Sequence, residues 1–475
     1  MATSFKILRL SNFRAVSRRV TCQATVRNLS LSQAFRAFSQ THTIHPRDTS
    51  MITTKNDKLN VVIIGGSYVG NKVVDEITPK VYKTHNVVLI EKNSHFRHLF
   101  AFPRIPVVPG FEHKAFIPYT QPGSTDVSAF FASVNAATTS TAEAVEGYTP
   151  LPSDSIQIVH AAATAILPDK VILGNGKDTI PYDFLVLATG TGRPGPDGLL
   201  GQDKEAGVKI GKFHQENVKK AKNIVIVGGG AYGIQMATDL KTHEPTKSKH
   251  VTVIHSRPHL LNRFHEGLHE ITLNKCKELG IDVILGKRVV IPEGGFPLET
   301  TDEEFDVHLV GGGLVRGDLV MLCTGAVPLS EPLRTLAPTA IDKNGFIHVK
   351  TTLQIDAPGI SNVFALGDVA DTGAHKAARP AIVQAGVVAR NIEKILQARA
   401  SGQTQPEKFD EYNADAAGIH LSLGLNASLK FRNPTAENAN PTIMWDETGS
   451  QKLDSGCSKV WALRAPWAGK DSYHL

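Results

Sequence analysis

The chain has 475 residues, of which 41% are hydrophobic and 20% are charged. This length predicts two to four domains, and the composition is typical of a soluble globular protein. The sequence contains no apolar run of about 18 residues, which a transmembrane helix would need. The net charge of +6 arises in residues 1–47, which hold eight basic residues and no acidic one. The remainder has 43 Lys and Arg against 45 Asp and Glu, so nothing predicts nucleic-acid binding.

Residues 1–50 form a leader that is rich in Arg and Ser, with scattered Leu, Phe and Val. This composition is typical of a mitochondrial presequence, and Arg36-Ala37-Phe38-Ser39 offers a processing site. The alternative is a disordered basic tail without targeting value. We therefore expect a mitochondrial protein, or a cytoplasmic one if the leader is not a presequence.

The four cysteines lie far apart in the sequence, at Cys22, Cys276, Cys323 and Cys457, and no CxxC motif exists. This spacing argues against a redox-active dithiol, a zinc site and a disulfide framework. We expect idle thiols and no metal site.

Four apolar residues run into a glycine-rich turn at 61–70. The pattern predicts a strand, a tight turn and a helix that begins at 71–77 and ends or bends at Pro79. In such a turn the backbone N–H groups approach a pyrophosphate. We expect this contact from a run of six residues, although Ser67 replaces a glycine of the usual pattern: Gly65, Gly66, Ser67, Tyr68, Val69 and Gly70. Glu91 ends the next predicted strand, 86–91, where an acid hydrogen-bonds the adenosine ribose.

Between the two nucleotide motifs the chain is less regular. Residues 94–119 are aromatic and basic, and we expect them to reach toward the flavin ring or the pyrophosphate. Residues 121–153 are interpreted as an insertion loop. Strands are predicted at 156–160, 170–173 and 180–187, the last running into Ala188-Thr189-Gly190, and the Pro- and Gly-rich stretch 193–201 is predicted to be a linker.

A second, complete fingerprint lies at 223–233, with its glycines at Gly228, Gly230 and Gly233. A helix is predicted to about residue 242, followed by a strand at 251–255. Beyond that strand come Ser256 and Arg257 rather than an acid, so we expect the site to tolerate or prefer NADPH, unless Arg257 simply faces water. A helix at 260–279 and strands at 283–285, 305–309 and 318–323 follow, and the last strand again ends in a Thr-Gly turn.

The strand predicted at 362–368 ends in Gly367-Asp368, before a helix at about 378–398. Asp368 can accept hydrogen bonds from the ribityl chain of a flavin, although an ordinary helix cap is the alternative. All three tryptophans lie in the tail, 402–475. Its last twenty residues are basic and partly amphipathic, which leaves open a membrane-surface contact or a docked or loose tail.

The order of these motifs resembles the pyridine nucleotide-disulphide oxidoreductase superfamily, and within it the apoptosis-inducing-factor-like family. The resemblance is to the ferroptosis-suppressor-like members of fungal type, and it runs from about residue 58 to 434. The stretches that carry it are VVIIGGSYVG, HFRHLFAFPR, FLVLATGTG, NIVIVGGGAYGIQMATDL, VTVIHSRPHLL, LVMLCTGAVP, NVFALGDVAD and LGLNASLKFRNP.

The resemblance implies an α/β fold with two Rossmann-like dinucleotide-binding domains, the NAD(P)H domain inserted in the FAD domain. FAD would be bound by 58–195 and 351–400, NAD(P)H by 196–350, and 401–475 would form a small C-terminal segment. It also implies that Arg104 and Asp368 contact FAD and that Lys376 lies near the flavin edge on the electron-acceptor side. Pro380, Ala381 and Gln384 fall where relatives line the quinone side.

One departure concerns Gln235, which stands where relatives carry a glutamate near the nicotinamide–flavin junction. The function implied is hydride transfer from NAD(P)H through FAD to a quinone-type acceptor. Two alternatives stay open: a biosynthetic oxidoreductase of a small aromatic substrate, and an apoptosis-related signalling flavoprotein with low turnover, which Gln235 slightly favours. Oligomeric state cannot be read from the sequence.

Overall fold

The structure is a computed structural model that describes residues 58–127, 130–131, 154–192, 202–448 and 453–475. The leader, its processing site, most of the predicted insertion and the predicted linker lie outside the described residues. Every helix and strand below belongs to one unit, residues 47–291 and 296–475.

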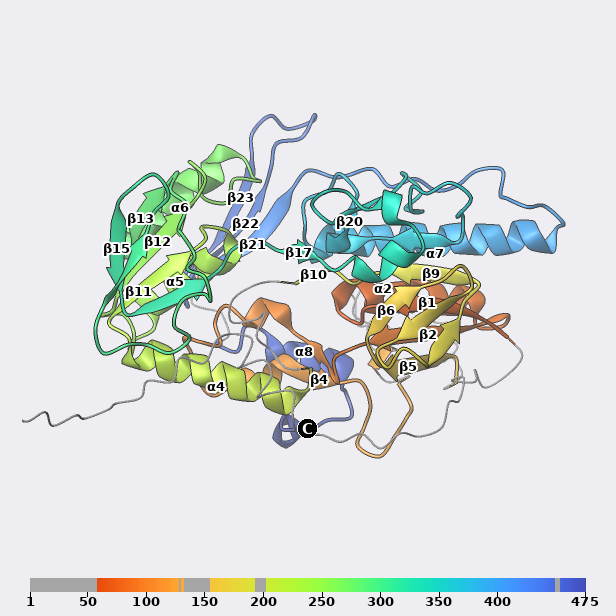
Figure 1. The fold of residues 1–475 in the computed structure, drawn as a ribbon, viewed down its shortest axis with the longest axis horizontal. Helices are drawn as coiled ribbons and strands as arrows, with labels where there is room; N and C mark the ends of the chain where they lie inside the picture. Colours follow the sequence, from red (N-terminus) through yellow and green to blue (C-terminus); the bar gives the residue numbers. More distant parts are fainter. Residues whose placement is uncertain (1–57, 128–129, 132–153, 193–201, 449–452) are drawn as a thin grey trace, which may run out of the picture. The chain divides into compact units, whose positions relative to one another are not determined.

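The first sheet is parallel, with the strand order β19-β9-β1-β2-β5. Its strands are β1 (Leu59–Ile64), β2 (His85–Glu91), β5 (Ile156–His160), β9 (Phe184–Leu187) and β19 (Val363–Ala365). These strands are near-continuous apolar runs, as expected where both faces of a parallel sheet are covered. Helices α2 (Tyr68–Val81) and α7 (Ala378–Ala400) pack against each other and share one apolar cluster with this sheet (Figure 1).

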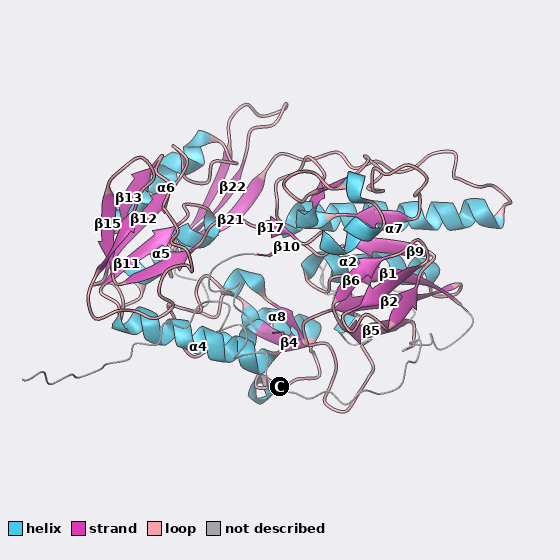
Figure 2. Ribbon diagram, viewed as in Figure 1, coloured by secondary structure: helices cyan, strands magenta, loops and turns pink. Residues whose placement is uncertain are grey.

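The second sheet is also parallel, with the order β13-β12-β11-β16. It is formed by β11 (Asn223–Val227), β12 (His250–His255), β13 (Asp282–Leu285) and β16 (Leu319–Leu322). Helices α5 (Ala231–Thr242) and α6 (Glu266–Glu278) lie beside this sheet (Figure 2). Both helices contribute to its apolar core. Helix α4 (Lys204–Lys220) precedes β11, and Asp203 caps it by accepting from the Ala206 N–H at 2.7 Å.

Short strands complete the fold. The antiparallel groups are β6 (Ala163–Ile166), β7 (Lys170–Leu173) and β8 (Thr179–Pro181); β3 (His95–Arg97) and β4 (Phe116–Pro118); β10 (Thr191–Gly192) and β17 (Val327–Pro328); β14 (Phe305–His308) and β15 (Leu314–Gly317); and β21 (Gly418–Ser422), β22 (Ser428–Arg432) and β23 (Thr442–Asp446). A parallel pair joins β18 (Ile347–His348) to β20 (Ala370–Asp371). Helix α8 (Cys457–Arg464) lies near the end of the chain.

Most predicted strands are confirmed to within a residue or two, and four elements differ. The strand predicted at 362–368 ends at Ala365, and Gly367–Val369 form a short 3-10 helix instead. The helix predicted at 260–279 begins only at Glu266, because Leu261 has φ +50° and donates its N–H to the Gly229 carbonyl at 3.0 Å. The strand predicted at 180–187 is two strands, β8 and β9, in different sheets. Helix α2 continues past Pro79 to Val81, so Pro79 does not end it.

The C-terminal segment 453–475 is docked on the rest of the protein. Trp461 is buried and donates its indole N–H to the Lys114 carbonyl at 2.9 Å, and Arg464 donates to the Phe130 carbonyl at 3.2 Å. Arg464 therefore faces the protein while Lys459 is exposed, and buried Trp461 together with Arg464 supports the docked interpretation for this helix. Within the described residues, no helix combines the length and the apolar character of a membrane span.

Candidate nucleotide-binding sites

The first glycine-rich loop joins β1 to α2 in a shape that only glycine permits at two positions. Gly65 has φ +105°, and a Cβ there would lie 2.5 Å from the Ala188 carbonyl oxygen. A Cβ at Gly70 would overlap the Gly65 carbonyl. Ser67 has an extended backbone, φ −82°, so a side chain costs no strain there and the departure from the usual glycine is tolerated.

Glu91 closes this loop from the end of β2. Its Oε2 accepts the Gly66 N–H, and its Oε1 accepts the Asn93 N–H at 2.8 Å. The Gly66 carbonyl accepts from Tyr119 Oη at 2.7 Å and from Asn71 Nδ2 at 3.0 Å. Glu91 is therefore placed beside the loop, as its predicted contact with the ribose requires.

The second loop, between β11 and α5, repeats the first position by position. Gly228 has φ +127°, and a Cβ on it would overlap the Cys323 carbonyl, as one on Gly65 would meet Ala188. A Cβ on Gly233 would overlap the Gly228 carbonyl. Gly230 has φ −84° and open space around it, so it matches Ser67 and confirms that this position does not demand glycine.

His255 is the residue that sequence reasoning missed. Gly65 donates its N–H to the Ile90 carbonyl at 2.9 Å, and Gly228 donates to the Ile254 carbonyl at 2.8 Å. The next residues therefore correspond, and as Glu91 accepts the Gly66 N–H, His255 Nδ1 accepts the Gly229 N–H at 3.1 Å. The sequence pattern directs attention to the positions beyond the strand, Ser256 and Arg257, where no acid stands. Glu91 is the last residue of the strand predicted at 86–91 and His255 the last of the strand predicted at 251–255, so aligning these two strands by their ends identifies His255.

A third segment contacts the first loop from far along the chain. Gly367 follows β19 with φ +73°, and a Cβ there would lie 3.2 Å from Val69 Cγ1. Gly367 donates its N–H to Gln384 Oε1 at 2.8 Å, and Gln384 Nε2 donates to Thr372 Oγ1 at 3.0 Å. Gln384 is buried, so its amide holds the Gly367 turn.

Lys376 and Asp368 lie just beyond this turn. Lys376 donates to the Ala370 carbonyl, and its Nζ lies 4.6 Å from the centre of the Phe346 ring. Burial lowers the pKa of Lys376, while the carboxylates of Asp368 and Asp371 oppose that shift. The turn thus brings a lysine near Asp368, next to a segment that contacts the first glycine loop.

Arg104 has a partner that the sequence did not suggest. It is buried, and its Nε and Nη2 donate to the two carboxylate oxygens of Asp239 in α5 at 2.9 and 3.1 Å. This paired geometry is the strong form of an arginine–carboxylate contact. The predicted FAD contact of Arg104 stays a prediction beside this ion pair.

The remaining predicted residues have less defined surroundings. Gln235 lies half-buried in α5, and its side chain makes no hydrogen bond among the described residues. Arg257 is exposed, two residues beyond β12. Tyr68 lies at the start of α2, and its hydroxyl lies 2.6 Å from His98 Nδ1, while His98 Nε2 donates to the Ser455 carbonyl at 2.9 Å. The docked tail therefore reaches the first loop through His98.

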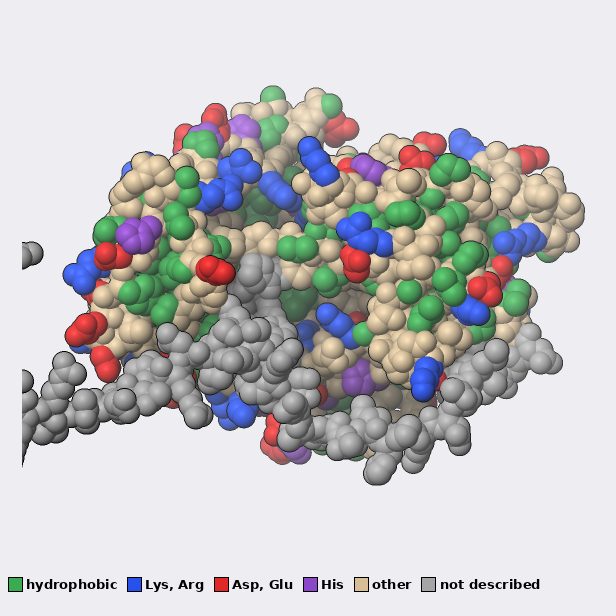
Figure 3. Space-filling view, viewed as in Figure 1, with side chains coloured by type: hydrophobic (Ala, Val, Ile, Leu, Met, Phe, Trp, Pro, Cys, Tyr) green, Lys and Arg blue, Asp and Glu red, His purple; other side chains and the backbone are tan. Residues whose placement is uncertain are grey.

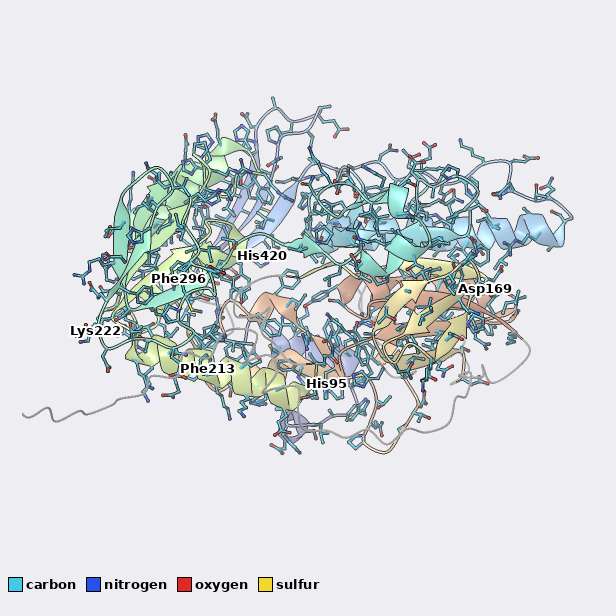
Figure 4. All side chains as sticks on the ribbon, viewed as in Figure 1. His95, Asp169, Phe213, Lys222, Phe296 and His420 are labelled. Atoms are coloured by element: carbon cyan, nitrogen blue, oxygen red, sulfur yellow. The ribbon has the colours of Figure 1, made fainter. Side chains whose placement is uncertain are left out.

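In the aromatic stretch after β2, Phe96, Phe102 and Phe116 are buried and Phe100 is exposed. His95, labelled in Figure 4, begins β3, and burial lowers its pKa to about 4. It is therefore neutral near pH 7. Within the described ranges, no cluster of three or more His, Cys, Asp or Glu side chains is arranged to hold a metal ion.

These features define a class of protein: a mixed α/β fold with two parallel sheets, each carrying a glycine loop shaped for a dinucleotide. Both loops fit such a ligand, because the first and last glycine of each loop leave no room for a Cβ and keep the turn tight. The backbone N–H groups of such a turn can then approach a pyrophosphate. The chain belongs to the family described as pyridine nucleotide-disulphide oxidoreductase, whose model matches residues 59–402. Its cofactors are FAD and NAD(P)H.

Individual relatives agree with this assignment. The chain is 32% identical to Fe-regulated protein 8 of Mycosarcoma maydis, over 86% of this chain and 96% of that protein. It is 28% identical to ferroptosis suppressor protein 1 of Homo sapiens, over 79% and 89% of the two chains. The resemblance to ferroptosis-suppressor-like proteins inferred from sequence is confirmed. Among solved structures, the sulfide:quinone oxidoreductase of Aquifex aeolicus has the same fold, with a TM-score of 0.60, 18% identity, and coverage of 86% of this chain and 92% of that one.

Proposed function

We propose that the protein is an NAD(P)H-dependent FAD oxidoreductase that delivers electrons to a quinone-type acceptor. The observation that carries the proposal is the pairing of two nucleotide loops of the same shape with a sequence that has no CxxC motif. Burial raises the pKa of Cys276 to about 12 and also raises that of Cys457, so both thiols stay protonated and unreactive. A relay through a protein dithiol is therefore disfavoured, and an external acceptor is favoured.

The residues around the loops would position the cofactors. When bound, FAD supplies the redox chemistry between hydride donor and acceptor. Gly65 to Gly70 would hold its pyrophosphate, Glu91 its ribose and Asp368 its ribityl chain. Lys376 offers a cation on the same segment, where it would stabilise negative charge that develops on the cofactor or acceptor. Gly228, Gly230 and Gly233 would hold the NAD(P)H pyrophosphate, and Gln235 in the next helical turn would lie toward the nicotinamide.

The name of one structural neighbour supports a quinone as the acceptor class. Sulfide:quinone oxidoreductase is a quinone enzyme by name, and its likeness here concerns the fold. The domain assignment (58–195 and 351–400 for FAD, 196–350 for NAD(P)H) is part of the proposal. It is supported by β19, which joins the first sheet from beyond residue 350.

The test is steady-state oxidation of NADH and NADPH by the FAD-loaded protein with a panel of benzoquinones and naphthoquinones. We expect turnover with at least one quinone and a marked loss of kcat in Lys376→Met. Flavin bleaching by NADPH without turnover on any quinone would contradict the quinone assignment. That result would favour the low-turnover signalling alternative, which the neutral side chain of Gln235 supports. Turnover confined to small aromatic substrates would favour the biosynthetic one.

We further propose a peripheral membrane contact through the C-terminal segment, at β23 instead of α8. Ile443, Met444 and Trp445 are 40, 59 and 45% exposed on this edge strand. Figure 3 shows both acidic and basic side chains across the drawn face. The proposed contact therefore depends on apolar side chains and not on a surface of one charge. Cosedimentation with neutral phosphatidylcholine vesicles is expected to fall in Met444→Asp, and equal binding by that variant would exclude this strand.

Mitochondrial targeting is a separate proposal that rests on the basic, Ser-rich composition of residues 1–50. A fluorescent protein fused behind residues 1–50 is expected to enter mitochondria. Cytoplasmic fluorescence would indicate that the leader is not a presequence.

A further inference from the structure

The two nucleotide loops are near copies, and they differ in the side chain that closes each one. Glu91 Oε2 accepts the Gly66 N–H in the first loop, and His255 Nδ1 accepts the Gly229 N–H at 3.1 Å in the second. Because Nδ1 is the acceptor, the single ring proton of the neutral imidazole is on Nε2. The first loop thus ends in an anion and the second in a neutral group.

The pKa of His255 agrees with a neutral ring. Burial lowers the pKa of His255 most, contacts with the His259 backbone and the Asn262 side chain oppose the shift, and the nearby Arg257 and His269 add to it, so that the pKa stays below its ordinary value. A carboxylate at this position accepts hydrogen bonds from ribose hydroxyls and repels a 2′-phosphate. A neutral imidazole lacks the repulsion and loses one of the two carboxylate acceptors.

The surroundings of His255 add positive charge. Arg257 stands where Asn93 stands in the first loop, two residues beyond the closing side chain, and Asn93 donates to Glu91. Lys287 donates its backbone N–H to the His255 carbonyl at 3.1 Å, which places a second basic residue beside the end of β12. Both basic residues are exposed, and no acid occurs in 255–265 or 283–291.

We propose that His255 and Arg257 form the specificity-determining subsite for the adenosine 2′-phosphate, so that the protein binds NADP(H) in preference to NAD(H). His255 leaves the subsite uncharged, and Arg257 pairs with the phosphate. The proposal rests on the use of NAD(P)H by the family and is independent of the electron acceptor.

The experiment is isothermal titration of the FAD-loaded protein with adenosine 2′,5′-bisphosphate and with 5′-AMP, which need no turnover. We expect the bisphosphate to bind about tenfold or more tightly, which is about 1.4 kcal/mol. His255→Glu is expected to abolish or reverse this ratio, because a carboxylate repels the phosphate. Arg257→Gln is expected to reduce it, and the matched control His255→Gln, which stays neutral and can accept the Gly229 N–H, is expected to keep it within about threefold.

The first loop indicates that His255→Glu is compatible with folding, since Glu91 makes the same bond there. FAD content and thermal melting confirm the fold of each variant. A wild-type protein that binds 5′-AMP as tightly as the bisphosphate overturns the proposal, as does an unchanged ratio in Arg257→Gln or in folded His255→Glu. A protein that fails to reduce quinones but keeps these ratios would overturn only the proposed function.

Discussion

Asp75 is a carboxyl group buried in α2 without a hydrogen bond to either oxygen among the described residues. Burial raises its pKa from 3.8 to about 7, although Arg464 lies 3.7 Å away and opposes the shift. The attraction is too weak to offset the cost of burying the charge, because no hydrogen bond accompanies it.

This pKa predicts a pH-dependent effect of Asp75→Asn. Between about pH 4 and pH 7 the folded state keeps a proton that the unfolded chain has lost, so Asp75 lowers stability as the pH rises through this window. Relative to wild type, Asp75→Asn is expected to gain a few kcal/mol, on the order of 1.4 kcal/mol per unit of pKa shift, between pH 4 and 7. Urea unfolding at several pH values measures this difference. The exposed Asp302→Asn is the control, and a difference that stays constant with pH would contradict the prediction.

Helix α8 shows how a weak element is held by a few contacts. It has eight residues, too short to be stable alone, and is anchored by buried Trp461. Lys204 supports the segment that follows, since it donates to the carbonyls of Leu475 and of Tyr473, the latter at 2.8 Å, and lies 4.9 Å from the Trp461 ring centre.

Two substitutions of Trp461 separate its hydrogen bond from its packing. Trp461→Phe keeps most of the apolar contact and loses the bond to the Lys114 carbonyl, at a cost of about 1 to 2 kcal/mol. Trp461→Ala leaves a cavity and is expected to cost about 3 to 5 kcal/mol. Thermal or urea unfolding measures both. Exposed Trp445→Ala should change stability by no more than about 0.5 kcal/mol, and an equal effect at the two tryptophans would argue against the docked segment.

The elements differ in how far the sequence determines them. Strands such as β2 and β11 could be predicted because apolar runs followed by glycine or an acid fix both their type and their ends. Helix α8 could not, because its position depends on the Lys114 carbonyl, far away in sequence. The early start predicted for α6 failed because apolar spacing continues through 260–265, while the Gly229 carbonyl holds Leu261 outside a helix.

At the site, the sequence identifies the residues whose backbone conformation admits only glycine. It misses the residues whose role depends on a hydrogen-bond partner far away in the sequence. Gly65 and Gly228 were predictable because positive φ and close packing admit glycine alone. His255 was missed because histidine is not part of the dinucleotide-binding motif, and its correspondence to Glu91 becomes visible only when the two loops are aligned. Gln384 was placed on the quinone side, and the structure shows its amide bonded to Gly367 and Thr372.

At the scale of the whole molecule, the ion pair of Arg104 with Asp239 links the segment after β3 to helix α5, which follows the second glycine loop. Both side chains are essentially buried, at 1% and 0% exposure. Burying both charges therefore costs desolvation free energy, and the pair contributes to stability through its two hydrogen bonds. Its two residues are 135 positions apart, so neither could be matched to the other from the sequence.

A double-mutant cycle tests whether this link is structural. Arg104→Met alone leaves the buried carboxyl of Asp239, whose pKa burial already raises, without its partner and is expected to cost about 3 to 5 kcal/mol, whereas the double variant with Asp239→Asn should cost clearly less than the sum of the two. Urea unfolding of the four proteins gives the coupling free energy between the two residues, and additive losses would show that the pair is not coupled.

FAD titration of the same four proteins separates the predicted FAD contact of Arg104 from its structural role. If Arg104 also binds the cofactor, Arg104→Met lowers FAD affinity in both backgrounds, while Asp239→Asn alone leaves FAD affinity unchanged. Equal FAD affinity in all four proteins would leave Arg104 with the structural role alone.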